Sequence, residues 1–244
     1  MTATDARILP FREASRELAE EARLPIVLPT GTFVADASVA WLLAKVEDWH
    51  IFARVPRHDP GWFHASGLGQ SDDDLISRYR GTEHETHSAR TLRIFDLGSA
   101  RDRDWKRYLR LAGVLDGKRA GRRVRFPNLK LTGECDAVVV DAQGDRWVLE
   151  LKTINPYGFN ALQQPQAAHL MQIHSYMVGL QIMRGMVLYE NKGNQDLKLF
   201  RVEFDSVLWD GIVARLRRLR VEAELGLKAL STPEGRTKAA ALEM

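Results

Sequence analysis

Cysteine is nearly absent from this 244-residue sequence, in which Cys135 stands alone. A disulfide within the chain needs two cysteines and a cysteine-ligated cluster needs several, so the single thiol excludes both. Long apolar runs are missing too, and none approaches the roughly 18 residues typical of a transmembrane helix. The first 23 residues carry too many charges for a secretory signal. We therefore expect a soluble, cytoplasmic protein with no membrane partner.

The sequence also lacks a strong excess of charge of either sign. Its formal net charge is +3 and its isoelectric point is about 9.1. This mild excess permits a nucleic-acid partner without requiring one. No internal repeat is visible, and the length suits one large domain or a core with an added arm.

The most informative stretch is LTGECDAVVVDAQGDRWVLELK, residues 131–152. Three valines at 138–140 end a first strand, the turn DAQGD offers Gly144 for a positive φ, and a second strand follows at 146–153, which together predict a β-hairpin. Because side chains alternate along a strand, Glu150 and Lys152 are expected to point the same way. Pairing across the turn can bring Asp136 close to Glu150. The hairpin thus predicts two acids and a lysine at one place.

Two neighbouring carboxylates repel each other unless a cation lies between them. Their oxygen atoms suit Mg²⁺ or Mn²⁺, which keep bound waters for chemistry. A lysine beside such a metal can orient a water and stabilise developing negative charge. The combination fits hydrolysis of a phosphodiester, although a hairpin with solvated charges would show the same short pattern.

Helical periodicity marks a second group of candidates, His169, Gln172 and Tyr176, which share one polar face of a predicted helix. A run of arginines near residues 215–220 indicates either a solvated helix face or contacts with phosphates. Residues 64–90 are polar and predicted to be loop-like. The predicted helices cover residues 12–23, 36–49, 95–115, 166–184 and 206–230, and the strands outside the hairpin cover 122–127, 186–190 and 197–202.

Four motifs now stand in order: GECD, ELK, HLMQIHSY and LYENK. Together they resemble the PD-(D/E)XK nuclease superfamily, in its RecB-like and CRISPR-associated exonuclease branch with phage-encoded relatives. The likeness covers residues 62–205. It implies an α/β, restriction-endonuclease-like core with a central mixed β-sheet flanked by helices. The expected organisation is a helical arm at 1–60, a nuclease core at 61–205, and a long C-terminal helix with a tail at 206–244.

The resemblance also implies roles at the catalytic centre. Asp136 and Glu150 would hold Mg²⁺ or Mn²⁺ together with the carbonyl of Leu151, and Lys152 would position the attacking water. The implied activity is that of a metal-dependent deoxyribonuclease, an exonuclease on DNA ends in phage or bacterial replication, recombination or repair. A structure-specific endonuclease remains an alternative.

Further roles concern the DNA. Gln172 and Tyr176 would bind and orient the strand near the scissile phosphate. Lys192 would contact the DNA backbone, or else form a surface salt bridge. The DNA expected is single-stranded or a duplex with an end, and no protein partner is indicated.

Two departures from the family pattern stand out. The family has a Gly-x-x-x-His motif, and the corresponding run here looks like Gly98-x-x-x-Asp102. Asp102 is therefore the expected third metal-ligating side chain. The run GTEHE at 81–85 also resembles this motif, but its spacing to the other motifs fits less well. The cysteines that bind an iron–sulfur cluster in many relatives are missing, so no such cluster is expected. Because Asp102 replaces a histidine, a DNA-binding or assembly module with a degraded site is the non-enzymatic alternative.

Overall fold

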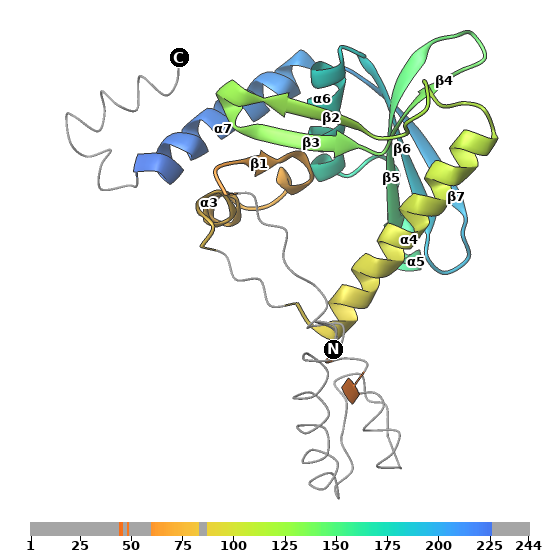
Figure 1. Ribbon diagram of the computed structural model, residues 1–244, viewed down its shortest axis with the longest axis horizontal. Coiled ribbons are helices and arrows are strands. Elements are labelled where there is room, and N and C mark those ends of the chain that lie inside the picture. The colour runs from red at the N-terminus through yellow and green to blue at the C-terminus, as the bar shows by residue number, and fades with distance from the viewer. Residues whose placement is uncertain (1–43, 46–47, 49–59, 83–86, 226–244) are drawn as a thin grey trace, which may run out of the picture. The chain divides into compact units, whose positions relative to one another are not determined.

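The structure is a computed structural model that describes residues 44, 45, 48, 60–82 and 87–225 (Figure 1). The chain divides into two compact units, residues 1–56 with 86–95 and residues 57–85 with 96–244. Each unit is taken by itself, and both sheets described below belong to the second. The predicted arm at 1–60, with the helices expected at 12–23 and 36–49, lies almost wholly outside the described residues, and so do residues 83–85 of the GTEHE motif.

The strands of the described residues form two sheets (Figure 1). They are β1 (Phe63–His64), β2 (Arg122–Phe126), β3 (Leu131–Cys135), β4 (Ala137–Val140), β5 (Arg146–Ile154), β6 (Arg184–Asn191) and β7 (Leu197–Glu203). One sheet has the order β1-β3-β2 and the other β4-β5-β6-β7. In the larger sheet β5 and β6 run parallel, whereas both outer pairs are antiparallel. The predicted mixed sheet of a restriction-endonuclease-like α/β core is confirmed.

Helices cover both faces of the larger sheet. They are α3 (Asp72–Arg80), α4 (Ala89–Leu111), α5 (Pro156–Ala161), α6 (Ala167–Leu180) and α7 (Ser206–Leu225), with 3-10 turns η1 (Ala65–Gly67) and η2 (Pro127–Leu129). Val148 and Val187 pack in one apolar cluster with Ile173 of α6. Leu149 packs in a second cluster with Trp105 of α4. Neighbouring residues of β5 thus face opposite helices, as strand geometry requires.

Three predicted boundaries were wrong. Helix α4 runs from Ala89 to Leu111, not over 95–115, because Ser88 accepts the Thr91 N–H at 3.2 Å at its start and Gly113 adopts φ +70° after its end. Residues 64–90 are not only loop, because Ser71 caps α3 by accepting the Asp74 N–H at 3.2 Å. Three aspartates in the first turn favour this helix end electrostatically, so a helix forms despite the polar composition. Helix α6 ends at Leu180, not near residue 184, because Gln181 adopts φ +57° and closes the helix. No described helix has both the length and the apolar character needed to span a membrane.

Two arginines of α7 bind this helix to the segment around α3. The Arg215 guanidinium donates to the carbonyls of Leu68 and Gln70 and pairs with Asp72, to which Arg218 also donates. The sequence left two interpretations for this run of arginines, a solvated helix face or contacts with phosphates. Arg215 fits neither, because its guanidinium binds groups of the protein itself. Its partners lie more than 140 residues away in sequence, which helical periodicity cannot reveal.

Candidate active site

Asp136 lies in the bend where the chain leaves the smaller sheet and enters the larger one. Strand β4 pairs with β5 from Ala137–Leu149 outward, and the same register continued by one residue places Asp136 opposite Glu150. The Asp136 Oδ2 atom accepts the Leu151 N–H at 2.6 Å. The predicted hairpin is therefore present between β4 and β5, but residues 131–135 belong to the other sheet. That break points Asp136 at the β5 backbone.

Glu150 is buried, with 2% of its surface exposed. Its Oε1 atom pairs with the Lys152 Nζ at 2.7 Å, whereas its buried Oε2 atom has no hydrogen-bond partner. Burial, reinforced by the charge of Asp136, raises the pKa of Glu150 to about 8. Burial likewise raises the pKa of Asp136 to about 6, with a further contribution from Asp102. Ionising both Asp136 and Glu150 therefore costs free energy, and a cation bound between them would reduce that cost.

A hydrogen-bonded chain joins Lys152 to helix α6. The Lys152 Nζ donates to the Gln172 Oε1 at 2.9 Å, and the Gln172 Nε2 donates to the Tyr176 hydroxyl at 2.9 Å. Gln172 and Tyr176 are four residues apart and both buried, so one helix face presents them together. The structure therefore brings Gln172 into contact with the lysine of β5 and joins Tyr176 to it through Gln172.

Asp102 comes to the same place from α4. Its Oδ2 atom pairs with the Lys106 Nζ at 2.8 Å, and its Oδ1 atom is buried without a hydrogen-bond partner. The negative charge of Asp102 helps raise the pKa of both Asp136 and Glu150, which places it within electrostatic reach of them. Lys106 is a site residue that our sequence reasoning missed, although the spacing of four from Asp102 was a readable signal.

The donor atoms fit a divalent cation. Carboxylate oxygens are the ligands preferred by Mg²⁺ and Mn²⁺, and Glu150 and Asp102 each keep one buried oxygen without a donor. Among the described residues, however, no three His, Cys, Asp or Glu side chains are gathered closely enough to form a metal group. The Lys106 and Lys152 ammonium groups lie beside the carboxylates instead. A metal ion would have to compete with these two lysines.

A half-buried histidine and a buried glutamate lie on the elements that flank the centre. His169 contacts the Tyr189 hydroxyl through Nδ1 at 2.7 Å, and burial lowers the pKa of this histidine to about 4. Glu190 is buried on β6 and binds Arg101 and the Trp105 indole N–H of α4. His169 was visible on the polar face of the predicted helix. The Glu190 pairing was missed because its partners lie more than 80 residues away.

Lys192 is not brought into this cluster. It follows β6, and its backbone N–H donates to the Ile154 carbonyl at 2.8 Å. Within residues 60–82 and 87–225, no ion pair or hydrogen bond joins its ammonium group to the other candidate side chains. The alternatives of backbone contact and surface salt bridge therefore both stay open for Lys192.

Comparison with known proteins gives likeness in structure but not in sequence. No protein-family model and no curated protein matches the chain. Two matching crystal structures are of LHK-Exo, an alkaline exonuclease from Laribacter hongkongensis, one of them in complex with dAMP. The first has a TM-score of 0.51 at 17% identity and covers 80% of this chain and 99% of that chain. The second has a TM-score of 0.51 at 18% identity and covers 75% and 95%.

The likeness shows a shared fold. At this identity it does not transfer an activity. A third solved structure, titled SSO0001, matches at a TM-score of 0.49 and 16% identity, covering 82% of this chain and 98% of that chain.

Proposed function

We propose that the protein is a divalent-metal-dependent deoxyribonuclease of the PD-(D/E)XK superfamily, in its RecB-like exonuclease branch. The observation that carries the proposal is the cluster of Asp136, Glu150 and Lys152 on a restriction-endonuclease-like sheet, with a buried carboxylate oxygen left without a donor. The shared fold with an alkaline exonuclease that was crystallised with dAMP supports DNA as the substrate.

The residues proposed to hold Mg²⁺ or Mn²⁺ are Asp136, Glu150, the Leu151 carbonyl and Asp102. The ion would polarise the scissile phosphate and acidify a bound water. Asp136 already has one oxygen fixed by the Leu151 N–H, which leaves the other available. Burial of Glu150 excludes bulk water and strengthens electrostatic interactions at the reacting phosphate.

Lys152 is the proposed catalytic cation. Gln172 holds its ammonium group in place, so its charge is oriented before DNA arrives. Lys152 would position the attacking water and stabilise the charge that develops on the phosphate. Gln172 and Tyr176 would orient the strand, and Lys192 would contact its backbone outside this centre.

The test compares linear DNA with covalently closed circular DNA, each in Mg²⁺, Mn²⁺ or EDTA. We expect stepwise shortening of end-labelled linear DNA in either metal, an intact circle, and no cleavage in EDTA or by Asp136→Asn. Nicking of the circle at a comparable rate would favour the structure-specific endonuclease. Binding without cleavage in any metal would favour the non-catalytic module.

A further inference from the structure

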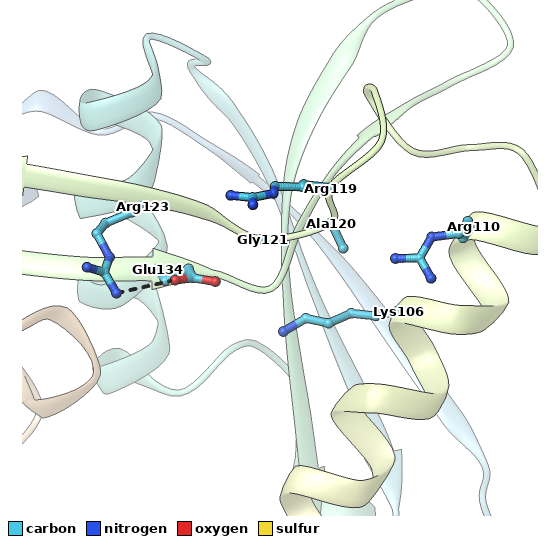
Figure 2. Close-up of a pocket in the computed structure, with 7 residues that line it drawn as sticks. All are labelled: Lys106, Arg110, Arg119, Ala120, Gly121, Arg123 and Glu134. Carbon is cyan, nitrogen blue, oxygen red and sulfur yellow. Dashed lines mark ion pairs between the residues drawn. The ribbon is translucent and has the colours of Figure 1, made fainter. Parts of the chain in front are cut away.

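A basic pocket of about 570 Å³ lies between α4 and the β2–β3 pair. In Figure 2, Lys106 and Arg110 reach toward it from α4, Arg119 lines it from the segment that enters β2, and Arg123 lines it from β2 itself. Glu134 is the acidic residue of its lining. Four basic side chains thus face one carboxylate, so the pocket suits an anion.

The positive charge is only partly neutralised, because Lys106 pairs with Asp102 at 2.8 Å but the arginines have weaker ion pairs or, among the described residues, none. The contact between Arg123 and Glu134 is 3.9 Å long, and both side chains are more than half exposed, so it contributes little. In the part of the chain that the structure describes, no ion pair is formed by the side chains of Arg110 or Arg119. Two exposed guanidinium groups therefore remain available, and guanidinium groups bind phosphate oxygens in bidentate geometry.

The charge continues beyond the pocket along β2. Arg123 and Arg125 are two residues apart on one strand and so share a face. The Arg125 guanidinium lies 3.9 Å from the centre of the Trp62 ring, and the Lys130 ammonium lies 5.3 Å from it. Cations in a row beside an aromatic ring are typical of surfaces that follow a single nucleic-acid strand. One isolated phosphate could not contact all of this row.

The pocket adjoins the candidate active site through Lys106. This residue lines the pocket, pairs with Asp102, and its charge acts on the pKa of Asp136. A strand bound in the pocket would therefore pass close to the carboxylates.

We propose that Lys106, Arg110, Arg119, Arg123 and Arg125 form a basic track that binds backbone phosphates of a DNA strand away from the scissile bond. The choice of DNA as the polymer rests on the proposed function. The open row of cations requires no strand end. A free mononucleotide offers the same phosphate chemistry but would occupy only a part of the track.

The experiment measures binding without cleavage, by fluorescence anisotropy of a labelled single-stranded 30-mer in EDTA. The variant is Arg110→Ala/Arg119→Ala, and Arg217→Ala, which removes one exposed arginine of α7 outside the track, is the control for non-specific loss of positive charge. We expect the double variant to bind at least tenfold more weakly. The slope of log K against log salt should decrease by about 1.4, because each lost phosphate contact on a single strand accounts for about 0.7.

Competition with unlabelled ligands identifies what the track recognises. A closed circular single strand should compete as well as a linear strand with the wild type, and should lose affinity equally in the double variant. Affinity of the double variant within twofold of wild type would overturn the track. A loss confined to linear strands would also overturn it, since the pocket would then recognise an end. If dAMP displaced the labelled strand as well as DNA does at the same phosphate concentration, the pocket would be a site for one phosphate and the track would be overturned.

Cleavage by the same proteins keeps this inference separate from the proposed function. If wild type binds through the track but cuts nothing in Mn²⁺, the catalytic proposal fails and the track stands. If wild type cuts DNA and the double variant binds normally, the track fails and the catalytic proposal stands. Circular dichroism of the two variants checks that each is folded.

Discussion

At the scale of single residues, Glu150 and Lys152 share one face of β5 and one ion pair of 2.7 Å. Their substitutions should nevertheless have different effects. Glu150→Ala removes a metal ligand, so Mn²⁺ affinity and cleavage should fall together. Lys152→Ala removes a cation next to the metal site, so Mn²⁺ should bind at least as well while cleavage falls by about 100-fold or more.

Calorimetric titration with Mn²⁺ and single-turnover cleavage of DNA measure the two effects on both variants. DNA affinity in Ca²⁺ should change much less than the cleavage rate for Lys152→Ala. A wild-type cleavage rate in that variant would show that the active site lies elsewhere.

Asp102 offers a second test, because its Oδ1 atom is buried without a donor. Asp102→Ala should weaken Mn²⁺ binding and cleavage, whereas Asp102→His should retain activity, since the family pattern that the sequence resembles has histidine at this position. Asp104→Ala is the matched control, as Asp104 is an ion-paired carboxylate of the same helix. Unchanged metal affinity and cleavage in Asp102→Ala would remove Asp102 from the metal site.

The buried Glu150 makes stability dependent on pH in the metal-free protein. Its folded pKa of about 8 lies above the ordinary 4.5, so its contribution to stability is present at low pH and is lost as pH rises through 8. The lowered pKa of His169 makes stability rise with pH, but only below the ordinary histidine pKa of 6.5. Between pH 6.5 and 8, the change in stability is therefore due to Glu150.

In EDTA, we expect the free energy of unfolding to fall across that interval, by at most about 1.4 kcal/mol per pH unit for one proton. Urea unfolding of wild type and Glu150→Gln measures it, and the variant should show a flatter profile. Identical profiles for the two proteins would mean that Glu150 ionises normally.

At the scale of elements, the contact between α6 and β2 depends on Gly179. A Cβ atom at Gly179 would lie 2.6 Å from the Cβ of Val124, a distance that side-chain rotation cannot relieve. Gly179→Ala should therefore destabilise the protein by about 1–3 kcal/mol, as overpacking does. Gly211→Ala in α7 is the matched control, because no atom lies within 4 Å of the new methyl group.

The control should stabilise the protein by about 0.5–1 kcal/mol, the usual gain when alanine replaces glycine inside a helix. Chemical denaturation of both variants gives the two values. Equal effects of the same sign would contradict the packing argument, since only the surroundings of the two glycines differ.

At the scale of the whole molecule, a single cysteine cannot supply the several thiolates that an iron–sulfur cluster needs. Cys135 is fully buried, and burial raises the pKa of its thiol to about 12, so it is a poor source of the thiolate that iron–sulfur clusters need. We expect the purified protein to be colourless and free of iron by absorbance and elemental analysis. Visible absorbance with stoichiometric iron would show that subunits share ligands.

The sequence alone determined the features that depend on neighbours along the chain. Strand alternation placed Glu150 and Lys152 on one face of β5, and helical spacing placed Gln172 and Tyr176 on one face of α6. The turn before Arg146 set the register of β4 on β5. These arrangements are local, so residue spacing encodes them directly. The roles assigned to these side chains stay predictions.

Only the tertiary structure decided which distant groups meet. It separated β3 from β4 at Asp136, and it bound Arg215 to the backbone at Leu68, 147 residues away in the sequence. The pairing of Arg101 with Glu190 and the basic pocket beside Lys106 arise in the same way. The spacing of residues along the chain does not indicate such contacts, because they depend on how helices and sheets pack once their apolar faces are buried.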